Sequence, residues 1–148
     1  MIGLDLNKYL GAWYEIARIP NEFEPKMKFV TADYSLNKDG SIQVVNSGHT
    51  QNEFKEIVGR AITTDDDMLL KVSFFSNIYS DYKILYLDED YQYSLVGGSA
   101  KNYLWILSRK PQLDRPTINK LIGIAKENGY DVDKLAMTEQ FEEVRYHE

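Results

Sequence analysis

Eight short segments in which apolar and polar residues alternate occupy most of the chain, and this period of two constrains the fold more than any other feature. Such alternation is typical of strands that bury one face. Turn-forming residues, as in Asn37-Lys38-Asp39-Gly40, separate neighbouring segments as they do in antiparallel hairpins. The pattern predicts an all-β fold, a meander closed into a barrel, and leaves a sandwich with crossed connections as the alternative. The segments lie at about residues 11–20, 29–37, 41–49, 54–64, 68–75, 80–88, 92–98 and 103–110.

One stretch of helical periodicity follows the strands. Its apolar residues are Ile118, Leu121, Ile122 and Ala125. Asp114 can cap the first turn, so we expect a helix at about 114–128 that packs against the outside of the barrel. A short strand at about 134–138 and a polar tail follow. We therefore expect residues 1–148 to form a single domain whose barrel covers about 11–110.

Composition excludes several functions. The 148 residues carry a formal net charge of −6, with an isoelectric point near 5.0, which argues against a nucleic-acid partner. The chain has no cysteine and two histidines, so thiolate chemistry and histidine-rich metal sites have almost no residues to use. We expect no metal and no cofactor. Residues 1–5 lack the features of a secretory signal, so the protein is either cytoplasmic or has lost a targeting segment.

The first segment carries a resemblance to a known family. Tyr9-Leu10-Gly11-Ala12-Trp13-Tyr14-Glu15-Ile16-Ala17-Arg18 resembles the Gly-x-Trp opening strand of lipocalins. Segments 70–75 and 103–109 look like the bacterial lipocalin and apolipoprotein D branch, and the resemblance covers about residues 5–140. It implies an eight-stranded antiparallel up-and-down β-barrel, open at one end, that binds fatty acids, lysophospholipids or similar lipids. It also implies export to the bacterial cell envelope, in the periplasm or at the outer membrane.

The alternation also predicts which side chains face the interior. One face of each strand is apolar and should point inward. In segment 80–88 both faces are apolar, so its inward face stays open. Tyr34, Asn46, Tyr82 and Trp105 add polar atoms to this apolar set, as a small-molecule site requires, although each can equally fill the core. The predicted ligand-binding residues are Val30, Ala32, Tyr34, Val44, Asn46, Ile57, Val72, Phe74, Tyr82 and Trp105, and Leu36 shares the predicted inward face.

Successive hairpins of a meander lie at alternate ends, which sorts the loops into two groups. The links at 37–41, 64–68 and 88–92 share one end, where Trp13 and Arg109 should meet and close the barrel. A guanidinium stacked on an indole contributes about 0.5 to 2 kcal/mol. The other end should be open. Its rim residues are Phe23, Met27, Phe75, Ile78 and Tyr79, and we expect them to contact a membrane or a second copy of the protein.

The leading hypothesis is the binding, storage or transport of a small hydrophobic ligand without covalent chemistry. One alternative is an enzyme on the same fold that acts on a lipophilic substrate. One observation argues against an enzyme. Glu15, two residues after Trp13 and so on the same face of the strand, is the one carboxylate that could point inside, and it has no visible catalytic partner. The other alternative is an interaction module that uses the apolar rim. The sequence does not identify the ligand or the oligomeric state.

Overall fold

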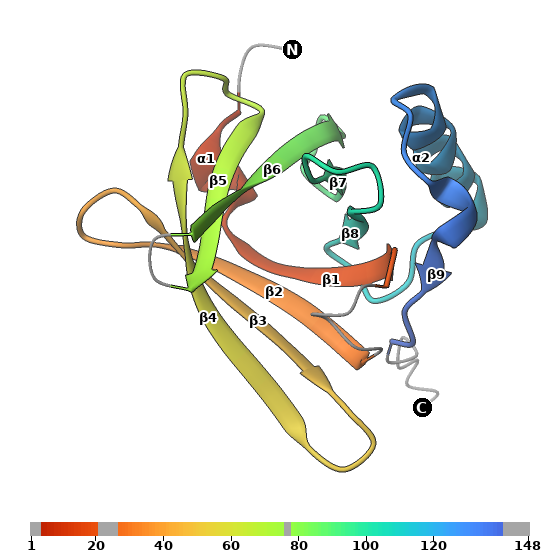
Figure 1. Ribbon diagram of the computed structural model, residues 1–148, viewed down its shortest axis with the longest axis horizontal. Coiled ribbons are helices and arrows are strands. Elements are labelled where there is room, and N and C mark those ends of the chain that lie inside the picture. Colours follow the sequence, from red (N-terminus) through yellow and green to blue (C-terminus); the bar gives the residue numbers. More distant parts are fainter. Residues whose placement is uncertain (1–3, 21–26, 76–77, 141–148) are drawn as a thin grey trace, which may run out of the picture.

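Eight antiparallel strands close into a barrel in the computed structural model, which describes residues 4–20, 27–75 and 78–140 (Figure 1). Each strand pairs with the next, and β1 pairs with both β2 and β8. The closed ring confirms the predicted barrel and excludes the sandwich. The strands are β1 (Gly11–Arg18), β2 (Lys28–Leu36), β3 (Ile42–His49), β4 (Phe54–Thr63), β5 (Leu69–Phe75), β6 (Ile78–Leu87), β7 (Tyr93–Gly97) and β8 (Leu104–Ser108).

Two α-helices lie outside the sheet. The helix α2 (Arg115–Glu127) packs against the outer face of the barrel, where its buried residues meet Leu95, Leu104 and Ile106 (Figure 1). Asp114 caps α2 by accepting a hydrogen bond from the Thr117 amide at 3.2 Å. The other is the single turn α1 (Leu6–Tyr9), which precedes β1 and has no counterpart among the elements expected from the sequence. None of the described helices is long and apolar enough to cross a membrane.

The seam between β1 and β2 is filled by the C-terminal segment. From Gly11 to Tyr14, β1 pairs with β2. Beyond this, β9 (Ala136–Met137), reached through the short helix η1 at residues 132–134, takes the place of β2 (Figure 1). The Gln140 side-chain amide then donates to the carbonyl oxygens of Glu15, at 2.8 Å, and Val30, at 2.7 Å. Residues close to the C-terminus thus complete the barrel wall.

A β-bulge in β6 resolves the strand whose inward face the alternation leaves open. The pairing of β6 with β7 shifts register between Ile84 and Tyr86. Before the bulge, Tyr82 and Ile84 face the interior, and after it Leu87 does. Leu85 and Tyr86 instead pack on the outside near α2. Each of the two apolar sets is therefore inward over part of the strand.

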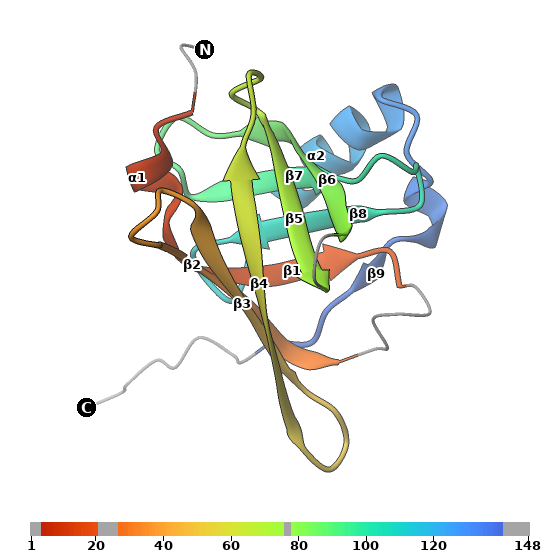
Figure 2. The same ribbon diagram turned by 60° about the vertical axis from the view of Figure 1, so that its left-hand side comes forward.

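The β3–β4 hairpin extends beyond the rest of the barrel (Figure 2). The strand β4 pairs with β5 only over Arg60–Thr63, so its first half has β3 as its sole partner strand among the described residues. Ile57, a predicted ligand-binding residue, lies on this projection and is 42% exposed. Leu36 is also exposed, at 54%, contrary to the predicted inward position. Because β1 begins opposite Tyr34, Leu36 lies past the end of β1 and has no strand to cover it there.

Candidate binding site

The interior of the barrel has two levels. At the closed end the side chains are almost completely buried, and we call this level the floor. Above it, toward the open end, the inward side chains are only partly buried, and we call them the lining. The floor comprises Tyr9, Trp13, Tyr34, Ile42, Val44, Ala61, Leu70, Ile84, Leu87, Val96 and Leu107. The lining comprises Asn46, Val72, Phe74, Tyr82 and Trp105.

Arg109 and Trp13 close the floor from below. The Arg109 guanidinium carbon lies 3.8 Å from the centre of the Trp13 ring, which is the contact expected from the sequence. The Trp13 indole N–H donates to the Tyr9 carbonyl at 2.8 Å, so α1 is fastened to the start of β1. The guanidinium also donates to four backbone carbonyls, those of Lys8 (2.7 Å), Leu10 (3.0 Å), Ala12 (2.9 Å) and Tyr91 (3.2 Å). Arg109 therefore ties together α1, β1 and the loop before β7.

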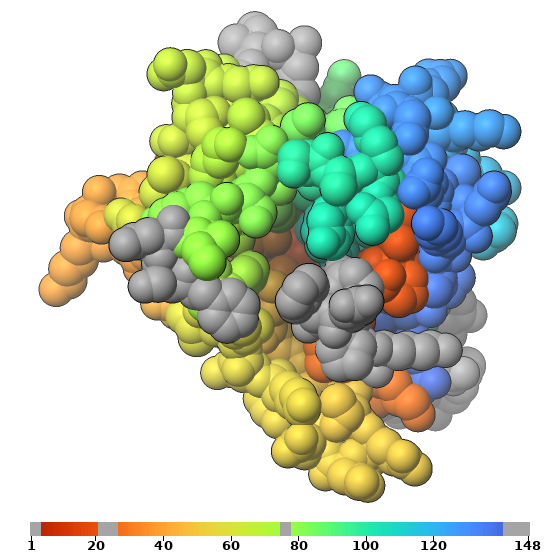
Figure 3. Space-filling view, in the orientation of Figure 1, coloured from red at the N-terminus to blue at the C-terminus, as the bar shows by residue number. Residues whose placement is uncertain are grey.

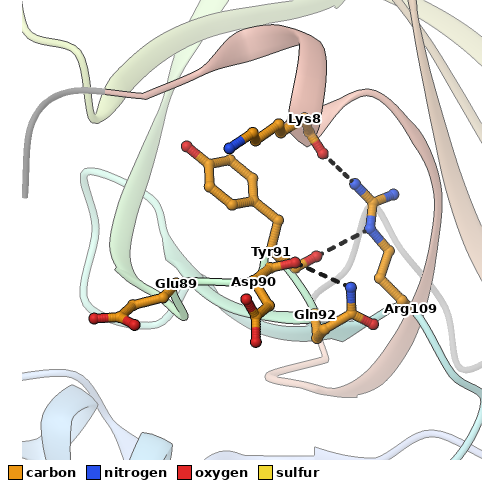
Figure 4. Close-up of a pocket in the computed structure, with 6 residues that line it drawn as sticks. All are labelled: Lys8, Glu89, Asp90, Tyr91, Gln92 and Arg109. Atoms are coloured by element: carbon orange, nitrogen blue, oxygen red, sulfur yellow. Dashed lines mark hydrogen bonds between the residues drawn. The ribbon is translucent and has the colours of Figure 1, made fainter.

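A shallow polar depression of about 340 Å³ lies on the outer side of this closed end (Figure 4). Figure 4 shows the Arg109 guanidinium pointing at the carbonyls of Lys8 and Tyr91. Its donors are thus already used by backbone oxygens. The acidic Glu89 and Asp90 share the depression, which makes it a poor place for a lipid. We assign the depression to the packing of Arg109 at the closed end, not to ligand binding.

Four hydroxyl groups form a hydrogen-bonded chain across the floor. Tyr82 Oη lies 2.9 Å from Tyr34 Oη and 2.7 Å from Tyr9 Oη, and Tyr9 Oη lies 3.2 Å from Ser94 Oγ. Burial raises the pKa of all three tyrosines above its ordinary value, because the phenolate form would lose its hydration. The hydroxyls therefore stay protonated and neutral at physiological pH. We call these four residues the hydroxyl chain.

The side chains of the lining are partly exposed. Trp105 stacks with Tyr103 at 6.4 Å between ring centres and 8° between planes. The Phe74 ring lies so close to Gly59 that a Cβ there would sit 2.6 Å from it, so only glycine leaves room for this ring. The space-filling view shows the surface hollowed among β6, the loop after β7 and the orange-red end of β1 (Figure 3). Partly exposed lining residues are consistent with a cavity that opens at this end.

The predicted ligand-binding residues divide between these levels. Val30, Ala32, Tyr34 and Val44 are buried in the wall and floor, with exposed fractions of 9% or less. Asn46, Val72, Phe74, Tyr82 and Trp105 are partly accessible, whereas Ile57 lies on the projecting hairpin. Sequence reasoning missed Tyr9 and Ser94. Tyr9 lies at the end of α1, four residues before Trp13, and this proximity to the Gly-x-Trp segment is the one signal that could have indicated it.

Glu15 is buried beside the seam, and its partners make it structural. It is 4% exposed, and its Oε2 accepts a hydrogen bond from the Thr138 hydroxyl at 2.7 Å. The Arg18 Nε lies 3.8 Å from the same oxygen, and Arg18 is 5% exposed. The carboxylate thus has a cation and a donor, as a buried charge requires. This arrangement holds the C-terminal segment to β1.

The predicted rim residues have different environments. Ile78 is 72% exposed, whereas the Tyr79 hydroxyl accepts a hydrogen bond from Arg60 Nη1 at 2.9 Å. Met27 packs beside Gly48. Phe23 and the side chain of Phe75 lie outside the described residues. Of the predicted rim, Ile78 is therefore the described residue that presents the most apolar surface.

Comparison with known proteins agrees with this geometry. A family model described as a lipocalin-like domain matches residues 4–140. The chain is 42% identical to the outer membrane lipoprotein Blc of Vibrio cholerae, over 92% of this chain and 82% of that protein. It is 35% identical to apolipoprotein D of Cavia porcellus, over 92% and 77%. The crystal structure of lobster apocrustacyanin A1 superposes with a TM-score of 0.77 at 19% identity, over 93% and 81% of the two chains.

Proposed function

Because this chain belongs to the lipocalin family, whose members generally bind or transport small hydrophobic ligands, we propose that its barrel holds a fatty acid, a lysophospholipid or a similar lipid. The proposed process is reversible binding without covalent chemistry. The ligand enters at the open end and lies against Val72, Phe74 and Trp105, above the packed floor.

The observation that carries the proposal is the contrast in burial along the barrel axis. The floor is closed by the contact between Trp13 and Arg109, while the lining remains partly accessible above it. Such a lining is mostly apolar, with few polar atoms, which is the composition of small-molecule sites. Transfer of a hydrocarbon chain into it would contribute about 0.8 kcal/mol for each buried CH₂ group.

Native mass spectrometry after mild extraction tests the proposal most directly. We expect a co-purifying lipid, whose mass identifies the ligand class. A fluorescent fatty acid titrated into delipidated protein should bind at one site in each barrel and be displaced by unlabelled fatty acid. Absence of both a co-purifying lipid and saturable binding would refute the proposal. Incubation with candidate lipids, followed by mass spectrometry of the products, tests the enzyme alternative.

We also propose a cell-envelope location and a contact role for the rim. The Vibrio cholerae relative is an outer membrane lipoprotein, and an envelope location suits a carrier of lipids. Ile78 is the exposed apolar residue on which the rim contact depends. Replacing Ile78 and Tyr79 together with serine should slow fatty-acid transfer from vesicles, or abolish a dimer in sedimentation, with little change in affinity for free fatty acid. Wild-type transfer rate and wild-type oligomeric state would refute the contact role.

A further inference from the structure

The hydroxyl chain has one hydroxyl hydrogen more than the number of hydrogen bonds among its four members. Tyr34, Tyr82, Tyr9 and Ser94 each carry one hydroxyl hydrogen, and three contacts join them in that order. Each contact uses one hydrogen. One O–H is therefore left without a partner inside the chain, and the direction of the chain decides which residue carries it.

Ser94 fixes the direction. Its side chain is completely buried, and its only hydrogen bond within the described part of the chain is the one to Tyr9. A buried donor without an acceptor costs about 1 to 3 kcal/mol, so the Ser94 hydrogen points at Tyr9. Tyr9 must then donate to Tyr82, because the buried Tyr9 O–H has no other acceptor among its contacts once Ser94 donates to it. The remaining O–H belongs to Tyr34 or Tyr82, at the other end of the chain from Ser94.

The leftover donor faces the interior beneath the lining. Tyr82 is partly exposed and belongs to the lining, while Tyr34 is 6% exposed and lies in the floor. The floor itself is built of neutral side chains. Arg109, the cation at this end of the barrel, stacks on the Trp13 ring and donates to backbone carbonyls. A single neutral donor in an apolar site suits a neutral acceptor, because a buried carboxylate would lose far more hydration than one hydrogen bond returns.

We propose that the floor accepts a neutral oxygen atom, a carbonyl or hydroxyl, carried at the inner end of a hydrophobic ligand. The inference rests on the proposed function, since it concerns the same cavity. A fatty acid would enter with its methyl end first and keep its carboxylate at the mouth in water. Among such acids, the floor distinguishes those whose inner end is oxygenated, because only these satisfy the leftover O–H of Tyr34 or Tyr82.

Three ligands of equal chain length test this. Dodecanoic acid, 11-oxododecanoic acid and 6-oxododecanoic acid share the carboxylate, and the two keto acids differ only in where the ketone sits. Each displaces N-phenyl-1-naphthylamine, a fluorescent probe without oxygen. In the wild-type protein we expect 11-oxododecanoic acid to bind roughly tenfold more tightly than the 6-oxo isomer, the size of one net hydrogen bond. Equal affinity of the two isomers would overturn the inference, and this comparison needs no variant.

The variant Tyr34→Phe/Tyr82→Phe removes both candidate donors. It should abolish the preference for the 11-oxo isomer. The readout is the ratio of the affinities of the two isomers, from which any change in the affinity of the probe cancels. Tyr86→Phe is the matched control, because the Tyr86 hydroxyl lies outside the barrel and accepts from Lys120 at 2.7 Å. A preference that persists in the double variant would refute the assignment to these hydroxyls. If none of the acids displaces the probe from the wild-type protein, the proposed function itself fails, which distinguishes the two results.

Discussion

The two levels of the barrel interior use the same strands and the same alternation, yet only one of them is packed. In the floor, Tyr9 from α1 fills the space between the strands, and Trp13 with Arg109 closes the end. In the lining, no comparable residue enters from outside the strands within the described part of the chain, and Phe74 and Trp105 stay partly exposed. The alternation of apolar and polar residues gives the strands an inward apolar face at both levels. Whether that face encloses a packed core or a cavity depends on a further element, here α1 with Tyr9. We expect stability to depend on the floor and affinity on the lining.

The largest effect should follow the loss of Trp13, which is completely buried at the closed end of the floor. Trp13→Ala should lower the free energy of unfolding by about 3 to 5 kcal/mol, because it removes a large core side chain and leaves a cavity. Urea unfolding monitored by circular dichroism measures this. Trp13→Phe, which keeps an aromatic ring, should cost much less. A loss below 1 kcal/mol for the alanine variant would contradict the assignment of stability to the floor.

A smaller effect is expected at Arg109. Arg109→Ala removes the stacking contact and leaves four carbonyls without this donor, so unfolding should become easier by about 2 kcal/mol. Fatty-acid affinity should change little, since the guanidinium lies below the floor. In a double-mutant cycle with Trp13→Phe, the two losses should not add. Strict additivity would disprove an energetic coupling between the ring and the guanidinium.

At Trp105 we expect the opposite balance, a loss of ligand affinity with little loss of stability. Because its ring is partly exposed in the lining, Trp105→Ala should weaken binding of a fluorescent fatty acid by several-fold, about 1 kcal/mol, and leave the fold intact. Fluorescence titration gives the affinity, and far-UV circular dichroism checks the fold. Met137→Ala is a suitable control, because this apolar side chain is 49% exposed on β9. Unchanged affinity in Trp105→Ala would remove the residue from the site.

The smallest effect is expected from pH. Up to about pH 10 the three buried tyrosines should not change the stability of the protein. Burial raises the pKa of Tyr9, Tyr34 and Tyr82 in the folded state. Their contribution to stability is therefore complete below the ordinary tyrosine pKa near 10 and is lost as the pH rises toward the folded values. In an absorbance titration of the eleven tyrosines, these three should ionise only with unfolding. Ionisation of all eleven in the folded protein would contradict the buried chain.

Much of the fold follows from local pattern. The strands end within two residues of the predicted limits, and Asp114 caps α2 as its position indicates. The pattern could not resolve β6, because a bulge between Ile84 and Tyr86 changes the inward set partway along the strand. Nor could it show that Leu36 is exposed, since this depends on where the neighbouring strand β1 begins.

The candidate site was less predictable than the fold. Parity correctly groups Ala32, Asn46 and Ile57 opposite one another on three strands, but it does not tell a floor from a lining or from a projecting hairpin. Those differences depend on how far each strand extends and on which side chains fill the closed end of the barrel. Ser94 is a further example, because its role depends on a contact with Tyr9, 85 residues away in sequence.

The seam between β1 and β2 also sets when the protein can finish folding. Gln140 bridges the two strands and lies 125 residues after Glu15 in the chain. At a synthesis rate of about 5 to 20 residues per second, roughly 6 to 25 seconds separate the making of the first strand from the making of the residue that joins it to the second. During that interval the edge of β1 beyond Tyr14 has no permanent partner on this side, a state in which exposed strands attract other chains. Folding yield in the cell should therefore depend on what shields the nascent chain until Gln140 has been made.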